Sequence, residues 1–586
     1  MAPFTTRPVI MARHGMITSG HYLATAAGLR IMEQGGNAID AAAAVCFCLN
    51  LLEPENNGLG GENPTLIYSA KEKKTYALSG MGWSPAAFTI DWCRQNGIDL
   101  IPGNGYLPAC VPAMAGSWVL ALARFGTMSF AQVVQPAIEL AEDGYPMYAS
   151  LQGTITGFAR LFTECYPSTA RIYLPDGHVP EIGEVIRNPD FARTLRTMCQ
   201  AEAAAKSKGR IAGIEAAGDA FYRGEITDKI LDFMTRYPVE DASGQFHTGL
   251  LTHADMAGWQ PALEAPVTLN YRGLDVYKCS SWTQGPVFLQ QLAILEGYDL
   301  ARLGHNTVDY LHTWIECAKL AFADREAYYG DPLLDSVPFD VLLSKEYASR
   351  RRELIGATAS PDLRPGDVGH GIPDYVTRSV RADNRRSLAS HTGDTTHLDT
   401  VDRAGNMVAS TPSGGWIQAS PVIEGLGFPM GTRGQMFYLN PDRPNALAPH
   451  KRPRATLTPT LVTRAGEPFM VFGTPGGDAQ DQWTLQFFLN YIDFGMNIQE
   501  ALDAPTVHTD HFPSSFYPRE AYPLAVSAEG RISAEVIQGL ERLGHKVTVG
   551  GDWIHGKVMG IRIDQEHGVL IGGASPRACV AYAIGY

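Results

Sequence analysis

The chain has 586 residues, with 47 lysines and arginines against 61 aspartates and glutamates, and a net charge of −14. This acidic balance argues against nucleic acid as a partner, although a local cationic pocket can still lie in an acidic protein. Hydrophobic residues make up 45% and charged residues 18%, as in soluble globular proteins. The length permits several domains or one large α/β body.

No targeting segment is recognisable in the sequence. The opening MAPFTTRPVIMARHGMI lacks the continuous apolar stretch of a signal peptide. The most apolar run, residues 41–52, is interrupted by Asn50 and is too short to span a bilayer. The nine cysteines form no CxxC pair, and Cys46, Cys48 and Cys317 lie in apolar helical stretches, which favours buried thiols. We therefore expect no membrane association and a cytoplasmic location.

Two helices are predicted near the start of the chain. The first begins near His21 and ends at Gly35-Gly36, a glycine pair typical of a helix end. Asn37 can cap the second helix, with Asp40 in its first turn. Because residues 41–52 are almost wholly apolar, this second helix must be buried.

Glu53-Pro54 ends that helix, and a glycine-rich segment follows at 58–61. This segment lacks the dinucleotide-binding fingerprint and favours a close backbone approach near an active site. Residues 65–68 then predict a strand. Further along, apolar residues spaced by three and four predict a long helix over 307–329, closed by Gly330 and Pro332.

The character of the chain changes beyond Gly356. Residues 357–394 are rich in Pro, Gly, Asp, Arg and Ser and carry almost no periodic apolar signal. We interpret them as a surface-draped or disordered segment, which a compact enzyme keeps mainly when it has a task. The task we expect is to deliver the Asp394–Thr395 bond for cutting.

Strand patterns dominate from Thr395 onward. They predict two hairpins, a glycine-rich turn and a helix, in the following order: 398–402 with 407–411, 460–463 with 469–472, 473–477, and 478–493. There is no fixed-period repeat and no low-complexity tract. The helix signals of the first part and the strand signals of the second predict a mixed α/β fold.

Thr395 carries the strongest chemical signal. If the chain is cut before this residue, its hydroxyl and a new α-amine lie on one amino acid, so nucleophile and base are together. An α-amine titrates at about 7.7–8.0 and accepts a proton near neutral pH. The alternative is that Thr395 is only a hydroxyl that opens a buried strand.

Segments along nearly the whole chain resemble the γ-glutamyltranspeptidase family of N-terminal-nucleophile hydrolases. They run in the family's order: GGNAIDAAAAVCFCLNLLEP, NGLGG, ECAKLAFADREAYYGDP, TTHLDTVDRAGNMVAS, KRPRATLTPTLV, FGTPGG and NYIDFGMNIQEALDAP. The resemblance implies that Thr395 is both the self-cleavage and the catalytic nucleophile. It implies a large chain of residues 1–394 and a small chain of residues 395–586, held together as one four-layer αββα sandwich. A homodimer is compatible with it.

The same resemblance assigns roles to residues around the nucleophile. Gly476 and Gly477 correspond to the oxyanion hole, and glycines between a strand and a helix can point bare N–H groups at negative charge. They can equally serve a tight turn. Ser413 stands where the family has a threonine that orients the nucleophile, with a simple turn residue as the alternative.

The head-group pocket departs from the family. The arginine that holds the substrate's α-carboxylate is missing at 78–81, and the paired serines become Ala455-Thr456. An asparagine becomes Gly415, and the acidic residue that accepts the α-ammonium aligns at or near Met436. Because an unpaired buried charge is costly, such a pocket should reject free γ-glutamyl head groups.

Arg433 offers a replacement cation. Its guanidinium can grip a carboxylate of a glutaryl-type or other dicarboxylic acyl group, or it can form a structural salt bridge. We therefore take Arg433, Thr456, Gly415 and Met436 as candidate substrate-binding positions.

Other signals are weaker. Residues 551–557 have Walker-A spacing but end in Val558 and precede a strand pattern, so we treat them as chance. His397 and Asp399 are expected to be strand residues satisfied locally. The sequence contains no HExxH motif or Cys/His cluster, so we expect no metal and no cofactor.

The prediction is an autoprocessed, γ-glutamyltransferase-like amide hydrolase or acyltransferase that acts on a small-molecule amide or peptide-like substrate. Two alternatives stay open. One is a true γ-glutamyl transferase, a glutathione hydrolase with a rebuilt head-group site. The other is a non-catalytic relative that binds a ligand in the old pocket.

Overall fold

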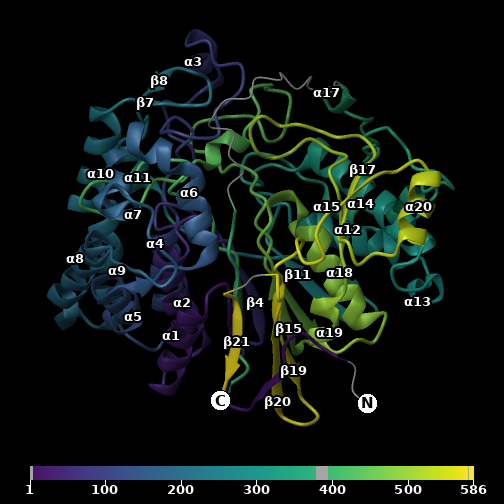
Figure 1. The fold of residues 1–586 in the computed structure, drawn as a ribbon, viewed down its shortest axis with the longest axis horizontal. Helices are drawn as coiled ribbons and strands as arrows, with labels where there is room; N and C mark the ends of the chain where they lie inside the picture. Colours follow the sequence, from purple (N-terminus) through teal and green to yellow (C-terminus); the bar gives the residue numbers. More distant parts are fainter. Residues whose placement is uncertain (1–3, 378–393, 578–579) are drawn as a thin grey trace.

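The computed structural model describes residues 4–377, 394–577 and 580–586. Two seven-stranded antiparallel sheets form its centre (Figure 1). The first sheet has the strand order β1 (Ile10–Ala12), β20 (Val569–Ala574), β19 (Met559–Asp564), β15 (Glu467–Gly473), β14 (Thr460–Arg464), β11 (Leu274–Lys278) and β10 (Val267–Tyr271). The second has the order β21 (Tyr582–Gly585), β2 (Gly15–Ser19), β12 (Leu398–Asp402), β13 (Met407–Ser410), β3 (Thr65–Ser69), β4 (Lys74–Leu78) and β9 (Leu263–Glu264).

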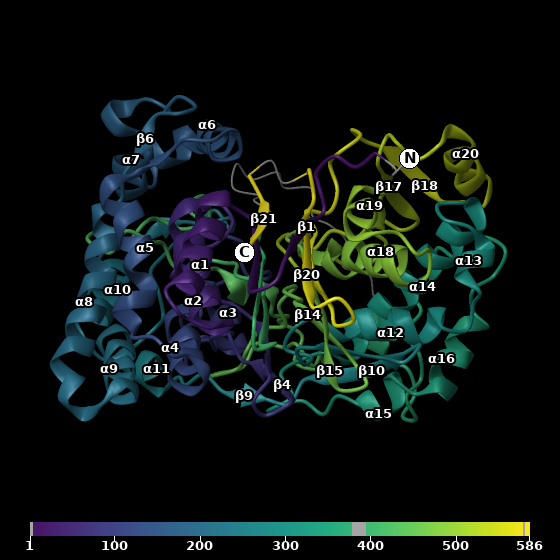
Figure 2. The ribbon, with the colours of Figure 1, turned by 90° about the horizontal axis from the view of Figure 1, so that it is seen from below.

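The two sheets face each other across an apolar core. Met16 and Val401 of the second sheet share this core with Val471 and Ile561 of the first. The outer face of the second sheet packs against α1 (Tyr22–Glu33) and α2 (Ala38–Leu52). The outer face of the first packs against α12 (Pro286–Leu295), α14 (Val308–Tyr328) and α18 (Gln480–Ile492). Helices therefore cover both outer faces of the paired sheets (Figure 2).

Further helices extend the two helical layers. Beside α1 and α2 lie α4 (Met114–Phe125), α5 (Phe130–Asp143), α6 (Ala149–Glu164), α7 (Pro167–Tyr173), α8 (Pro189–Ala205), α9 (Arg210–Tyr222), α10 (Glu225–Arg236) and α11 (His253–Gly258) (Figure 1). Beside α14 and α18 lie α13 (Leu300–Leu303), α15 (Phe339–Leu342), α16 (Lys345–Arg352), α19 (Ile498–Asp503) and α20 (Ala534–Arg542) (Figure 2). No helix among the described residues is both long enough and apolar enough to cross a bilayer.

The predicted helices near the start of the chain are confirmed. The Asn37 side chain accepts hydrogen bonds from the first turn of α2, and the Asn37 backbone N–H donates to the Asp40 carboxylate, which completes a capping box. Every residue of α2 is buried, as its apolar sequence requires. The long helix is confirmed as α14, with Thr307 at its N-cap.

Both predicted hairpins are also confirmed. β12 pairs with β13 and β14 pairs with β15, each antiparallel. In the second sheet β12 and β13, which follow the Asp394–Thr395 bond in the sequence, lie between β2 and β3, which precede it. Cutting that bond would leave two chains that share both sheets.

Two element boundaries differ from the prediction. Thr395 does not open a strand, because β12 begins at Leu398 and Thr395 is joined to Ser413 only by an isolated bridge. Pro412 has no N–H to continue the ladder, although its carbonyl accepts from the Thr396 amide. The helix predicted from 478 begins at Gln480, after a 3-10 turn over Gly477–Ala479.

The described part of the segment beyond 356 lies over α14 and α16. Residues 357–377 contain only one short helix, α17 (Asp374–Thr377). The Gly366 amide donates to Asp324 at 2.7 Å, and its carbonyl accepts from the Tyr328 hydroxyl at 2.5 Å. Residues 357–377 thus run over α14 and α16, and the interpretation of 357–394 as a pre-cleavage segment stays a prediction, since 378–393 lie outside the described residues.

Candidate active site

Thr395 lies three residues before β12 in the uncut chain, and only 2% of its surface is exposed. Its Oγ1 is 3.1 Å from the Ser413 Oγ. Its backbone N–H donates to the Asp394 carboxylate at 2.9 Å. The predicted nucleophile is therefore buried and held by both of its polar groups.

Ser413 connects three groups. Its Oγ contacts the Thr395 hydroxyl, donates to the Asp394 carbonyl oxygen at 3.1 Å, and accepts from the Arg433 Nη2 at 2.8 Å. The structure thus brings Ser413 into the contact that an orienting role needs. The role itself stays a prediction.

Trp416 supplies a second donor to the same carbonyl. Its indole Nε1–H lies 2.7 Å from the Asp394 oxygen and 2.9 Å from the Asn56 carbonyl oxygen. The ring is 1% exposed. Sequence reasoning missed this residue, and its place three positions after Ser413 was the only signal that pointed to it.

Arg433 is fully buried in an ion pair with Glu62. Its Nε and Nη2 both reach the Glu62 carboxylate, and Nη1 lies 3.8 Å from the Met436 sulfur, a weak acceptor. Burial raises the pKa of Glu62, against the opposing charge of Arg433. The salt bridge left open as an alternative is thus present, and carboxylate binding by Arg433 stays a prediction.

The glycine segment at 58–61 lies against the loop that carries Ser413. A Cβ on Gly61 would lie 2.1 Å from the Ser413 carbonyl oxygen, and one on Gly58 would lie 2.6 Å from that of Gly415. The predicted close backbone approach is confirmed. Gly415 itself has φ +66°, a conformation that favours glycine.

Gly476 and Gly477 follow β15 after Thr474 and Pro475. Their φ angles are +126° and +54°, and a Cβ on Gly476 would lie 2.1 Å from the Trp483 ring. Only glycine fits the first position, so the turn needs it for steric reasons alone. Donation by these N–H groups to an oxyanion stays a prediction.

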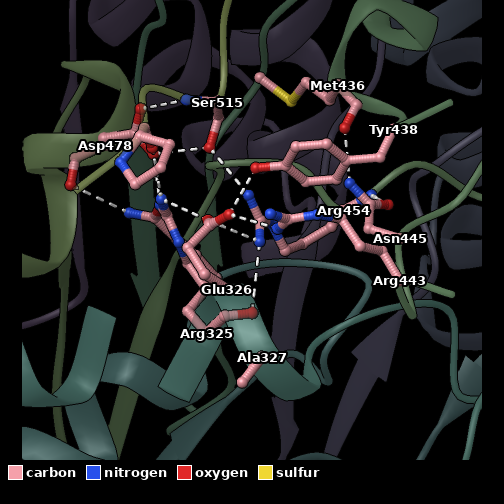
Figure 3. A network of polar contacts seen from close by, with 12 residues as sticks. Arg325, Glu326, Ala327, Met436, Tyr438, Arg443, Asn445, Arg454, Asp478 and Ser515 are labelled. Atoms are coloured by element: carbon pink, nitrogen blue, oxygen red, sulfur yellow. Dashed lines mark hydrogen bonds and ion pairs between the residues drawn. The ribbon is translucent and has the colours of Figure 1, made fainter. Parts of the chain in front are cut away.

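A buried polar network anchors this turn (Figure 3). Arg325 of α14 pairs with Asp478, and Ser515 donates to the same carboxylate through its N–H at 2.8 Å and its hydroxyl at 2.6 Å. Burial raises the pKa of Glu326, but the charges of Arg454, Arg325 and Arg443 outweigh it and lower the pKa to about 2. Glu326 is therefore ionised at neutral pH.

Thr456, the remaining hydroxyl of the family's serine pair, is fully buried. Its Oγ1 has no hydrogen-bond partner among the described residues. Substrate binding by Thr456 stays a prediction.

A cavity of about 190 Å³ opens beside the nucleophile. Thr395, Pro475, Glu53 and Lys557 line it, together with Asn56 and Arg577. The Lys557 ammonium pairs with the Asp394 carboxylate at 2.9 Å. Burial raises the pKa of Glu53 to about 7, against the opposing effects of the Thr396 hydroxyl and Lys557. Sequence reasoning missed both charged residues, since Lys557 belongs to the stretch set aside as chance.

His397 and Asp399 are satisfied locally, as predicted, although only Asp399 lies in a strand, since His397 directly precedes β12. The His397 ring bonds Asp399 at 2.9 Å and the Thr411 hydroxyl at 3.0 Å. Elsewhere His312, Glu316 and His545 form a buried group with metal-like spacing. Lys319 and Arg364 already pair with the Glu316 carboxylate, and these cations oppose a metal ion there. The predicted lack of a metal stays a prediction.

Comparison with known proteins defines the class. The family model "Gamma-glutamyltranspeptidase" matches residues 24–584. The chain is 32% identical to the glutathione hydrolase-like YwrD proenzyme of Bacillus subtilis (strain 168), over 96% of this chain and 97% of that protein. It superposes on the structure of LmbA2991HD with a TM-score of 0.92 at 42% identity, over 100% of both chains.

A cephalosporin acylase from Bacillus halodurans is also similar. That crystal structure has a TM-score of 0.83 at 32% identity, over 100% of this chain and 98% of the acylase. Together with the buried Thr395, these similarities place the protein among the N-terminal-nucleophile hydrolases. Within that class, the chain belongs to the γ-glutamyltranspeptidase family and is an enzyme of that family.

Proposed function

We propose that the protein is an amide hydrolase or acyltransferase that cuts itself between Asp394 and Thr395. The products are a chain of residues 1–394 and a chain of residues 395–586, which stay together as one four-layer αββα catalytic domain. The observation that carries the proposal is the 3.1 Å contact between the Thr395 and Ser413 hydroxyls, directly after a carbonyl held by two donors.

The free α-amine of Thr395 then acts as the base. It removes the proton of the Thr395 hydroxyl, and the oxygen attacks the substrate carbonyl. The N–H groups of Gly476 and Gly477 stabilise the tetrahedral oxyanion, and the departing amine takes up the proton. Water or an acceptor amine resolves the acyl-enzyme, with water as the acceptor we favour.

The acyl group we propose is glutaryl-like or γ-glutamyl-like, on a small-molecule amide or peptide-like substrate. Two features support a pocket that differs from that of a glutathione hydrolase. Met436 and Gly415 provide no charge for an amino-acid head group, whereas Thr456 offers an unpaired hydroxyl and Arg433 a cation. No cofactor enters this scheme. The cytoplasm remains our predicted location, and a homodimer remains compatible.

One observation favours a true γ-glutamyl transferase with a rebuilt head-group site. Glu62 and Arg433 lie together beside Ser413 and carry both charges that an α-amino acid requires. Each charge already satisfies the other in the uncut chain, so a glutaryl carboxylate has to compete with Glu62 for Arg433, whereas a zwitterionic substrate has to compete for both charges. We therefore rank this function second.

A pair of chromogenic substrates separates the two. Purified wild-type protein is offered a glutaryl anilide and a γ-glutamyl anilide, which differ only in the α-ammonium group. We expect a higher kcat/KM for the glutaryl compound. Preference for the γ-glutamyl compound would refute our specificity proposal and favour the second function. Turnover of neither compound, by a chain that remains intact, would favour a ligand-binding relative.

A further inference from the structure

The carbonyl oxygen of Asp394 lies in a pocket of hydrogen-bond donors. The Trp416 Nε1–H reaches it at 2.7 Å and the Ser413 hydroxyl at 3.1 Å. Both donors are buried. This carbonyl belongs to the very peptide bond that self-cleavage breaks, so these donors touch the reacting atoms before the reaction begins.

The hydrogen-bond arrangement around Ser413 fixes where its single proton lies. Arg433 can only donate, so the Ser413 oxygen accepts from it. The Asp394 carbonyl oxygen can only accept, so Ser413 donates its proton to that oxygen. The Thr395 hydroxyl must then donate to Ser413. The proton of the nucleophile is thereby directed at a group that can relay it.

We propose that the Trp416 indole N–H and the Ser413 hydroxyl form the oxyanion site of self-cleavage, separate from the Gly476–Gly477 pair proposed for substrate turnover. This inference rests on the proposed function, because it assigns residues to the scission at Asp394–Thr395. Trp416 and Ser413 are catalytic residues of this step. Arg433 is a positioning residue, which donates to Ser413 and has its guanidinium carbon 5.0 Å from the Trp416 ring centre.

The step balances without an added oxidant or metal. The Thr395 Oγ forms a bond to the Asp394 carbonyl carbon, and the carbonyl oxygen gains the negative charge that Trp416 and Ser413 stabilise. The carbon–nitrogen bond then breaks, and the nitrogen receives the proton that left the Thr395 hydroxyl, relayed by Ser413. The product is an ester between Asp394 and Thr395. One water molecule hydrolyses it, which leaves a carboxylic acid on Asp394 and restores the threonine hydroxyl.

The geometry explains why one reaction centre needs two oxyanion sites. The Asp394 carbonyl is attached to the backbone nitrogen of Thr395 itself, so the peptide bond fixes the direction of its oxygen. A substrate carbonyl carries no such attachment and approaches the nucleophile after Asp394 has been released. The two oxyanions need not point in the same direction.

The test measures how fast the full-length Trp416→Phe chain is cut to give the 395–586 fragment. Intact mass spectrometry monitors this conversion over time. Phenylalanine keeps a ring but removes the N–H. Loss of one oxyanion donor slows such reactions by about 100- to 1000-fold, and we expect a decrease of that size. Trp92→Phe, on the distant helix α3 (Ile90–Gln95), is the matched control and should cut at the wild-type rate. Wild-type cutting by Trp416→Phe would overturn the inference.

A second pair of variants separates chemistry from folding. Thr395→Ala and Thr395→Ala/Trp416→Phe cannot cut, so their thermal midpoints report the structural effect of the ring change alone. If the double variant is much less stable, variants of Ser413 provide the test instead. Ser413→Thr keeps the hydroxyl and should cut, whereas cutting by Ser413→Ala should be slowed at least about 100-fold. Equal cutting by both Ser413 variants would contradict the inference. Wild-type protein that never cuts would instead refute the proposed function itself.

Discussion

Two buried polar regions of the molecule, the charged network around Glu326 and the contacts of the Asp394 carbonyl, are built differently. In the network of Figure 3 every charge meets an opposite one: Arg325 pairs with Asp478 and Glu326, and Arg454 pairs with Glu326. At the Asp394 carbonyl oxygen two neutral donors converge, from Trp416 and Ser413, beside the ion pairs of Lys557 and Arg433.

The difference separates buried polar groups that support the fold from those that can take part in a reaction. Paired charges hold a backbone in place, because each partner would be costly to leave alone. Donors that converge on a carbonyl instead stabilise charge that appears only during reaction. The charged network holds the Gly476–Gly477 turn through Asp478.

Breaking the charged network should have the largest effect on stability. Arg325→Met removes a cation from the buried Glu326 carboxylate and from the Asp478 carboxylate, which is 15% exposed, and we expect a loss of about 3–5 kcal/mol in the free energy of unfolding. Denaturant titration in the uncut Thr395→Ala background measures it. The control is Arg160→Gln, which removes an exposed pair with Glu164 on α6 and should change stability by at most about 0.5 kcal/mol. Equal losses in both variants would contradict the distinction between the two regions.

Disturbing the glycine turn should mainly affect turnover. A Cβ on Gly476 would lie 2.1 Å from the Trp483 ring, so Gly476→Ala must displace the turn. We expect kcat to fall by about 100- to 1000-fold, the effect of losing one oxyanion donor. Gly495→Ala is the control, because this glycine also has positive φ but a Cβ there meets no atom within 4 Å. Wild-type kcat in Gly476→Ala would argue against the oxyanion role.

A smaller effect should appear in the pH dependence of stability. Burial raises the pKa of Glu53 from its ordinary 4.5 to about 7. Between these values the folded chain holds a proton that the unfolded chain has lost, so this carboxyl lowers stability as pH rises through the window. Glu53→Gln, in the Thr395→Ala background, lacks the effect.

We therefore expect the stability of Glu53→Gln relative to its parent to increase from about pH 4.5 to about pH 7 and then to level off. Denaturant titrations across this range measure the difference. A difference that is constant with pH would show that Glu53 ionises as it does in the unfolded chain.

Local signals explain what could be predicted from the sequence. Asn37 and Asp40 define the start of α2 through neighbouring hydrogen bonds, and its apolar run requires burial. The β12–β13 and β14–β15 hairpins likewise join adjacent segments. The position of Thr395 could be inferred because the chemistry predicted for it needs only this residue and the peptide bond that precedes it.

The remaining contacts join distant parts of the chain. Trp416 reaches Asn56 across 360 residues, Arg433 reaches Glu62 across 371, and Lys557 reaches Asp394 across 163. No local pattern marks such partners, because the packing of two sheets and two helical layers brings them together. For the same reason the sequence left open whether Arg433 forms a salt bridge.

The central claim is that Thr395 cuts the chain and then acts as its nucleophile. Intact mass spectrometry of the wild type beside Thr395→Ala, with amide turnover measured on the same samples, tests it most directly. We predict masses for residues 1–394 and 395–586 in the active wild type, and one uncut, inactive chain in the variant. An uncut wild type that turns over amides, or a variant that still cuts at this bond, would contradict the account.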